Sequence, residues 1–127
     1  MIYYEAKDFP IDGLEATGEN VKVHVPRGAE WRDYILFGDQ GGFSSITVYG
    51  DGNGDAYRNG RGDGDVHRWG GGNGSAMRNG DGDGNACRDG DGNGNAYRNG
   101  AGYGKAYRNG AGDGCAWCNS AGEFEED

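Results

Sequence analysis

Aspartate and asparagine alternate with glycine in the second half of the chain, in runs whose oxygen atoms could bind a divalent cation. One run reads Asp81-Gly82-Asp83-Gly84-Asn85, and Asp63 and Asp65 belong to another. Ca²⁺ prefers carboxylate and carbonyl oxygens, but a calcium loop of this kind ends on a bidentate glutamate that these runs lack. Nearby arginines can balance the acids without a metal, so we expect no bound metal.

The cysteines and histidines offer little further chemistry. Cys115 and Cys118 form a Cys-x-x-Cys, but a zinc site needs about four ligands, and only Cys87, His24 and His67 remain, at unhelpful spacing. Three cysteines, an odd number, argue against a disulfide framework. No histidine has a partner at catalytic spacing, and no Lys-Ser/Thr follows the glycine-rich runs as in a phosphate loop. The sequence therefore predicts a protein that is not an enzyme and has no cofactor.

All of these residues except His24 belong to seven decapeptides that fill positions 51–120 without an insertion. The unit reads x-G-x-G-x-A-(aromatic or bulky)-R-N-G. Glycine at every second residue disfavours a helix, and the constant register of Arg, Ala and Asn argues against disorder. Asn-Gly and Asp-Gly pairs suit tight turns. We predict an all-β fold, a narrow short-period β-solenoid of seven ten-residue coils, with glycine and alanine facing an interior too thin for larger side chains. A bundle of polyproline II strands is compatible with the same spacing.

When the seven units are aligned, each position of the unit forms a column, and the eighth column is arginine in six units. Exposed guanidinium groups in such a row would repel one another and attract phosphates or carboxylates. Structural arginines would instead bond to turn carbonyls and to the Asp and Asn of the third and fifth columns. We favour this structural ladder, which consists of Arg58, Arg68, Arg78, Arg88, Arg98 and Arg108.

Large aromatic side chains do not fit a glycine and alanine interior, so we expect several of them to form a stripe on the surface. Tyrosine and tryptophan on a rigid scaffold are favoured contact residues. The alternative is a ladder that stacks on itself to hold the coils in register. The candidate partner-binding residues are Tyr57, Trp69, Tyr97, Tyr103 and Tyr107, together with the acidic Glu123, Glu125, Glu126 and Asp127.

Composition divides the chain into three parts. Residues 1–50 contain short alternating apolar runs bounded by turn residues, so we expect a β-rich N-terminal cap that covers the open end of the solenoid. Residues 121–127 form an acidic C-terminal tail. The formal net charge of -9 divides into -4, -1 and -4 over residues 1–50, 51–120 and 121–127. A nucleic-acid binder would show a basic excess, so this balance favours a protein partner with a basic surface.

The repeat resembles the ten-residue coils of insect antifreeze solenoids, in which a tyrosine precedes a coil-spanning residue and a glycine closes the turn. Tyr57-Arg58-Asn59-Gly60 and its copies at 97–100 and 107–110 carry this resemblance, which implies a solenoid fold. The bridging cysteines of that family are absent. The Asp-x-Asp-x-Asn runs resemble repeats-in-toxin nonapeptides and the start of an EF-hand loop, although the period here is ten.

Glycine-rich decapeptides of this type also look like those of small phage and prophage proteins. That resemblance implies an intracellular inhibitor that occludes a basic, nucleic-acid-binding surface of a host defence complex, as anti-CRISPR proteins do. The alternatives are a structural virion tip or fibre segment and a calcium- or ice-binding repeat protein. We expect a monomer or small homo-oligomer that binds neither nucleic acid directly nor a membrane.

The compartment is also a prediction from sequence. No apolar run approaches the length of a membrane span, and the first residues lack the basic and apolar regions of a signal peptide. Together with the odd number of cysteines, this predicts the cytoplasm, that of the host cell if the protein is phage-encoded.

Overall fold

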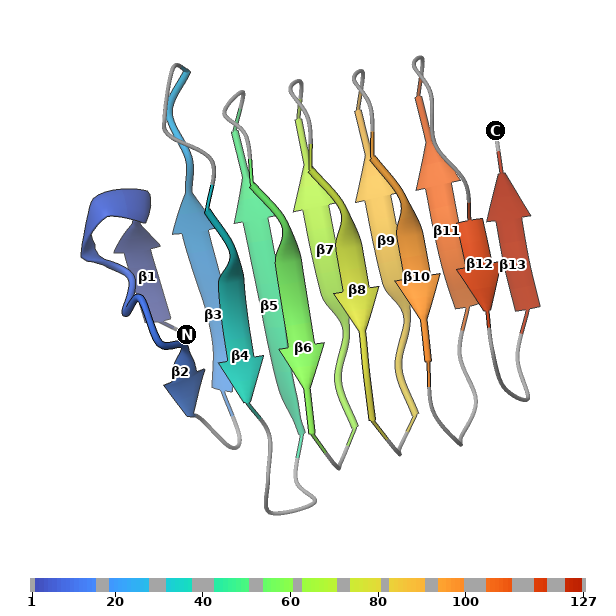
Figure 1. The fold of residues 1–127 in the computed structure, drawn as a ribbon, viewed down its shortest axis with the longest axis horizontal. Coiled ribbons are helices and arrows are strands. Elements are labelled where there is room, and N and C mark those ends of the chain that lie inside the picture. Colours follow the sequence, from blue (N-terminus) through green and yellow to red (C-terminus); the bar gives the residue numbers. More distant parts are fainter. Residues whose placement is uncertain are drawn as a thin grey trace.

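The chain winds into a rod made of two parallel β-sheets (Figure 1). The computed structural model describes residues 2–15, 19–27, 32–37, 43–50, 54–60, 63–70, 74–80, 83–90, 94–99, 105–110, 116–118 and 123–126. Sheet A contains β1 (Ile2–Glu5), β3 (Glu19–His24), β5 (Ser44–Tyr49), β7 (Val66–Trp69), β9 (Ala86–Asp89), β11 (Lys105–Asn109) and β13 (Glu123–Glu126). Sheet B contains β2 (Leu14–Glu15), β4 (Tyr34–Phe37), β6 (Ala56–Asn59), β8 (Ala76–Arg78), β10 (Ala96–Arg98) and β12 (Ala116–Cys118).

Each ten-residue unit of the repeat forms one strand, and successive units alternate between the two sheets. The pairing register joins Ala56 to Ala76 and Val66 to Ala86, so a full coil takes two units. The predicted all-β solenoid is confirmed, with hydrogen-bonded β-strands where polyproline II was the alternative. The prediction of ten-residue coils was wrong, because one short strand and one turn only reverse the chain. A second strand and turn are needed to bring it back to its starting edge.

Strand alternation decides which columns of the repeat face the interior. Alanine or valine at the sixth position and arginine at the eighth are buried, whereas the fifth, seventh and ninth positions face outward. The tenth position of the repeat forms a turn that favours glycine. Gly80 has φ of +105°, and a Cβ there would lie 2.3 Å from the carbonyl oxygen of Gly60 in the neighbouring coil. Close stacking of equivalent turns therefore explains the glycines at this position in the described turns.

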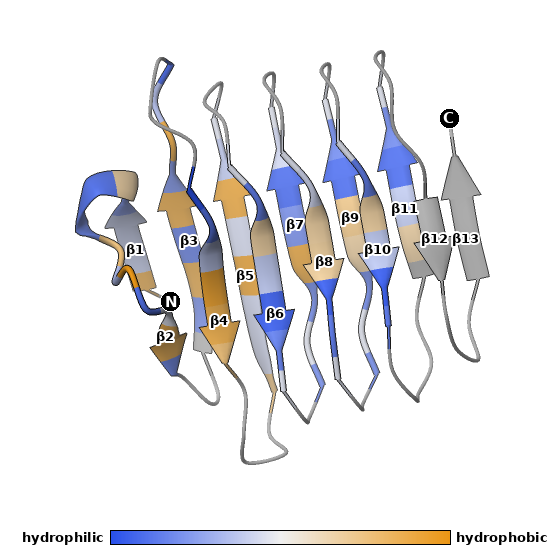
Figure 2. Ribbon diagram, in the orientation of Figure 1, coloured by the Kyte–Doolittle hydropathy of each residue, from blue (hydrophilic) through white to orange (hydrophobic). Residues whose placement is uncertain are grey.

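The first 50 residues are built into the same two sheets, because β1, β3 and β5 continue sheet A while β2 and β4 continue sheet B. Most of their inward positions are aliphatic, as in Val23, Val48 and Leu36. Figure 2 shows hydrophobic colour strongest in β3, β4 and β5, giving way to hydrophilic colour along the repeats. The segment predicted as a cap therefore continues the two sheets, and its interior is more apolar than that of the repeats.

The first turn of the chain closes over this apolar core. The short 3-10 helix η1 (Ala6–Asp8) leads to Phe9, which is 2% exposed. The Phe9 ring packs edge-on against Tyr4 and Tyr34, with ring centroids 5.3 and 5.7 Å apart. At the other end, the segment predicted as an acidic tail contains β13, which pairs with β11. Within the described residues, no helix has the length and apolar character that crossing a membrane requires.

Candidate functional site

The arginine column lies inside the rod. Arg58, Arg68, Arg78, Arg88 and Arg98 have no exposed surface, and Arg108 is 3% exposed. This corrects the expectation that only glycine and alanine fit the interior. Glycine in the fourth column leaves room for the guanidinium group: a Cβ on Gly74 would lie 2.9 Å from Nε of Arg68.

Main-chain carbonyl oxygens accept hydrogen bonds from the buried guanidinium groups. Nε of Arg88 donates to the oxygen of Gly74 at 2.8 Å, and Nη1 donates to those of Asp89 and Gly90, both at 3.0 Å. Nε of Arg68, Arg98 and Arg108 follows the same rule and donates to the carbonyl fourteen residues earlier, in Gly54, Gly84 and Gly94. Arg88 and Arg108 therefore join the turn after their own strand to the segment that leads into a strand of the facing sheet.

The arginines also stack on one another along the rod. Arg58, Arg78 and Arg98 are in register on β6, β8 and β10. Burial, followed by the charges of Arg58 and Arg98, lowers the pKa of Arg78 to about 10. That value still lies well above neutral pH, so Arg78 remains charged under ordinary conditions.

Outward side chains of the fifth column connect the coils in a second way. Oδ1 of Asp55 accepts a hydrogen bond from the main-chain N–H of Ser75 at 2.8 Å, and Oδ1 of Asp65 accepts one from Asn85 at 2.9 Å. From sequence, these side chains were expected only as partners of arginine or as possible cation ligands. The available signal was the restriction of this column to Asp, Asn and Ser in five of the seven units, since these types readily bond to nearby main chain.

Burial of the ladder separates the charges of the repeat. Six of the eight basic residues in 51–120 are the ladder arginines, whose guanidinium groups lie inside. The carboxylates that the structure describes in the repeat belong to outward or turn positions; they are Asp55, Asp63, Asp65, Asp83 and Asp89. A nearly balanced formal charge is therefore arranged as a cationic interior and an anionic surface.

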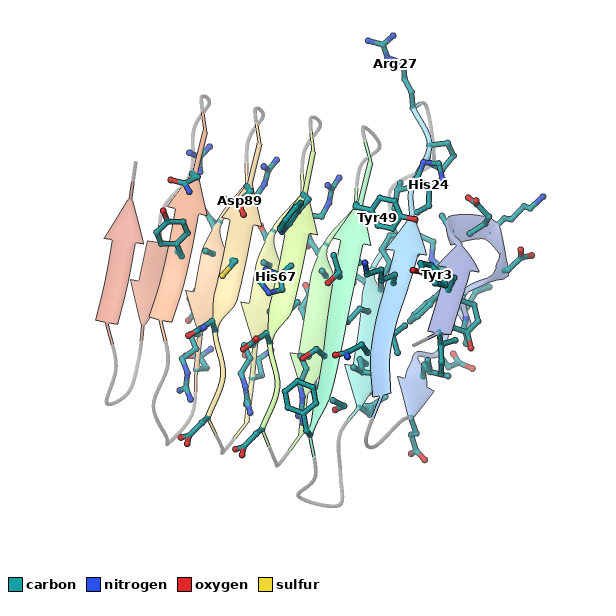
Figure 3. All side chains as sticks on the ribbon, turned by 180° about the vertical axis from the view of Figure 1, so that it is seen from behind. Tyr3, His24, Arg27, Tyr49, His67 and Asp89 are labelled. Atoms are coloured by element: carbon teal, nitrogen blue, oxygen red, sulfur yellow. The ribbon has the colours of Figure 1, made fainter. Side chains whose placement is uncertain are left out.

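The outward side of sheet A, called face A below, carries aromatic side chains and carboxylates together. Tyr49, Trp69 and Asp89 occupy neighbouring register positions on β5, β7 and β9. Trp69 is 51% exposed, and its indole lies edge-on to the ring of His67 with centroids 6.2 Å apart. Figure 3 shows Tyr49 and Asp89 near the same end of their strands, with His67 nearer the strand centre.

Face A continues onto the first strands with groups that pair among themselves. Nδ1 of His24 lies 2.9 Å from Oε2 of Glu5, and the His24 ring lies 5.3 Å from that of Tyr49. Nζ of Lys22 lies 5.9 Å from the centre of the Tyr3 ring, which is 64% exposed. The charged groups at this end are thus already matched.

The outward side of sheet B, called face B, has a different chemistry. Asparagines of the ninth column form a chain in which Nδ2 of Asn79 donates to Oδ1 of Asn59 at 2.9 Å, and Asn99 donates to Asn79 at 3.2 Å. The Tyr57 hydroxyl donates to Oδ2 of Asp55 at 3.4 Å. Burial, then the charge of Asp55, raises the pKa of Tyr57 to about 12. Many polar groups of face B therefore bond to each other.

The predicted aromatic residues do not form one stripe. Tyr57 and Tyr97 lie on face B and are half-buried, whereas Trp69 and Tyr107 lie on face A. The reason is that odd and even units of the repeat belong to different sheets. Tyr103 lies outside the described residues.

The predicted acidic residues divide likewise. The backbone of β13 places Glu123, Glu125 and Glu126 in register with Lys105, Tyr107 and Arg108 of β11, at the end of sheet A. Asp127 lies outside the described residues. The structure thus brings the acidic strand next to the unit of Tyr107 and away from the Tyr57 unit.

The thiol of Cys87 is poorly placed for chemistry. Burial, then the charge of Asp89, raises its pKa to about 12, so the reactive thiolate is scarce at neutral pH. In the described part of the chain, no three His, Cys, Asp or Glu side chains cluster as metal ligands would. Cys115 lies outside that part.

A hollow of about 870 Å³ opens at the N-terminal end of the rod, beside η1. Its described lining includes Lys7, Ile11 and Arg32. Arg32 donates from Nη1 to the carbonyl of Ala6 at 2.9 Å and from Nη2 to that of Pro10 at 3.1 Å, so it braces the first turn against β4. The described lining provides no nucleophile paired with a base.

Comparison with known proteins gives no assignment: no family model, no curated protein and no solved structure matches this chain.

Proposed function

We propose that the protein is a non-enzymatic binding protein whose anionic rod docks on a basic protein surface. The observation that carries this proposal is the burial of the arginine ladder, which takes six positive charges away from the surface and leaves the outward carboxylates there. Complementary charge steers association and selects partners. A surface of this sign would repel nucleic acid itself, so the partner is a protein.

Rigidity favours binding by such a surface. The ladders of arginine, of fifth-column side chains and of asparagine hold each coil against its neighbours. A preorganised surface loses little entropy when it binds, so more of the contact energy appears as affinity. A straight row of strands also suits an elongated cationic groove, which is the shape that nucleic-acid-binding proteins present to a duplex or single strand.

The most economical role is an inhibitor that occupies such a groove in a host defence complex, as anti-CRISPR proteins do. The test is competition: a purified CRISPR interference complex is incubated with labelled target DNA, and DNA binding is followed by fluorescence anisotropy with and without the protein. We expect the protein to lower DNA binding, and to do so less at high salt because the attraction is electrostatic.

Two charge variants locate the effect. The first combines Asp63→Asn, Asp83→Asn and Asp89→Asn, which removes three carboxylates from the sheet A side. Asparagine keeps an oxygen where Oδ1 of Asp63 accepts the Asp83 N–H at 2.9 Å, so the coils stay connected. We expect this variant to lose inhibition.

The control combines Asp8→Asn, Asp12→Asn and Glu15→Gln at the exposed N-terminal end. It changes the net charge by the same amount but leaves the repeats intact, so we expect inhibition to persist. The proposal is wrong if the protein does not lower DNA binding by the interference complex. It is also wrong if both triple variants inhibit as well as the unmodified protein.

A further inference from the structure

We propose that face A binds an arginine-bearing segment of the partner, with the indole of Trp69 as a stacking platform and the carboxylate of Asp89 as the ion-pairing group. This inference rests on the proposed function, because it assumes a basic partner. It goes further by assigning one of the two faces, two side chains and one chemical class of ligand.

Register places the two groups side by side. Trp69 on β7 pairs with Asp89 on β9, and neighbouring strands lie about 4.8 Å apart. The backbone of Trp69 is held on both sides, since its carbonyl accepts hydrogen bonds from Nη1 of Arg68 at 2.8 Å and from the N–H of Gly50 at 3.0 Å. The edge-on contact with His67 further restrains the indole.

Trp69 is available because it is exposed, and half-buried Asp89 because its carboxylate is not engaged by a described neighbour. Half of the Trp69 surface is open to solvent, so one side of the indole is accessible to a ligand. The Asp89 carboxylate accepts no hydrogen bond from another residue in the described part of the chain. By contrast, Oδ1 of Asp65 and Oδ1 of Asp63 are engaged by main-chain N–H groups of the next coil.

The pair matches a guanidinium group better than other cations. A guanidinium stacks flat on an indole and donates two parallel hydrogen bonds to a carboxylate, whereas an ammonium is a point charge that does neither as well. Two such groups about one strand spacing apart would engage a single arginine from its face and its edge. Tyr49 extends the aromatic surface on the other side of Trp69.

Among the side chains that the structure describes, face B does not show this combination. Its asparagines bond along the rod, and its Asp55 carboxylate is engaged by the Ser75 N–H and the Tyr57 hydroxyl. Tyr57 and Tyr97 are half-buried between their neighbours. Charge also favours an arginine segment over a glycan on face A, because a neutral sugar gains nothing from the excess of carboxylates.

The test uses two fluorescein-labelled peptides, one with alternating arginine and glycine and one with alternating lysine and glycine. Binding to the full-length protein is measured by fluorescence anisotropy at physiological salt. We expect the arginine peptide to bind about fivefold tighter than the lysine peptide, which corresponds to one cation–π contact at a partly exposed site. Equal binding of the two peptides would overturn the stacking role of Trp69.

Variants separate the two faces. Trp69→Ala and Asp89→Asn should each weaken the arginine peptide about fivefold and bring its affinity down to that of the lysine peptide. Tyr97→Ala and Asp33→Asn, on the sheet B side, are the matched controls and should leave it unchanged. Because the side chains of Trp69 and Asp89 face outward, the melting temperatures of the variants, measured by circular dichroism, should stay close to that of the unmodified protein. If Trp69→Ala melts at a lower temperature, the peptide affinities of Asp89→Asn and Trp69→Phe are compared with that of the unmodified protein instead.

The outcomes distinguish this inference from the proposed function. If the arginine peptide binds but only the sheet B variants weaken its binding, the assignment to face A is wrong, whereas the proposal of a basic partner is kept. If neither peptide binds and the interference complex is still inhibited, the arginine assignment is wrong. If neither peptide binds and inhibition is also absent, both proposals fail. Binding to a glycan array that Trp69→Ala abolishes would make face A a sugar platform and overturn the arginine assignment.

Discussion

Replacing one arginine of the buried ladder with methionine should destabilise the rod severely. Arg88 is suitable because it is fully buried in the middle of the repeats and donates hydrogen bonds of 2.8 to 3.0 Å to the carbonyls of Gly74, Asp89 and Gly90. Methionine fills similar space but has no donor. Arg88→Met therefore leaves the carbonyls of Gly74, Asp89 and Gly90 without this partner.

The magnitude follows from these carbonyls. The Asp89 carbonyl keeps the Gly70 N–H as a donor, so two carbonyls lose their partner. A buried acceptor left unsatisfied costs about 1–3 kcal/mol, so these two cost about 2–6 kcal/mol. The loss is partly offset because the variant no longer buries a charge in register with Arg68 and Arg108, and burial of an ion is itself unfavourable. We expect a net loss of about 3 kcal/mol, which is a large part of the roughly 5–15 kcal/mol that stabilises a typical domain.

Urea unfolding followed by circular dichroism measures this loss. With an m-value of about 2 kcal/mol/M, the midpoint should fall by about 1.5 M. Arg27→Met, at an exposed turn residue, is the control and should change stability by less than about 0.5 kcal/mol. Arg88→Lys keeps the charge but lacks the planar fork of donors, so it should lose most of the same stability.

The reasoning is refuted if Arg88→Met unfolds within about 1 kcal/mol of the unmodified protein, because the carbonyls would then be satisfied without the ladder. If Arg88→Lys proves as stable as the unmodified protein, charge alone would carry the effect. A large loss in Arg27→Met would mean that the assay reports net charge and not burial.

Three further perturbations test other contacts. Gly74→Ala places a Cβ 2.1 Å from the Gly54 carbonyl oxygen and should cost about 1–3 kcal/mol by overpacking, visible as an earlier thermal melt; an unchanged melt would contradict the close stacking of coils. Burial is the main cause that raises the pKa of Asp55, so ionisation of Asp55 destabilises the folded state above about pH 4. Asp55→Asn keeps an acceptor for the Ser75 N–H and should therefore be at least as stable as the unmodified protein at pH 7, with the difference lost below pH 4. Lower stability of the variant at pH 7 would contradict the effect of burial. Folding raises the pKa of Cys87 from 9.0 to about 12, so the protein should lose stability between pH 9 and pH 12 as the thiol ionises in the unfolded chain. The urea midpoint of Cys87→Ala should fall less over that range than the midpoint of the unmodified protein. The same fall in both proteins would refute this prediction.

Local features of the fold could be predicted from the sequence. The alternation Ala56-Tyr57-Arg58 specifies a strand with one inward and one outward side, and Gly60 after it specifies a turn with positive φ. Both properties depend on a few consecutive residues. The prediction of an all-β solenoid succeeded for this reason.

The candidate surface could be predicted only in part. Trp69 and Tyr57 were both expected at the surface, but a period of ten gives no indication that they lie on opposite faces. Pairing of each unit with the second one along, as in Ala56 with Ala76, is a long-range property. The neighbour of Trp69 is therefore Asp89, twenty residues away, and no local pattern connects the two.

The sequence by itself determined that this protein is a repeat of short strands separated by glycine turns, because strand alternation and turn conformation are decided by adjacent residues. Only the tertiary structure decided where the charges lie. An arginine next to a tyrosine in the chain is buried or exposed according to whether two facing sheets enclose it, and whether carbonyls of another coil lie within reach, as that of Gly74 does for Arg88. That enclosure places the positive charge inside the rod and leaves the carboxylates to meet a partner.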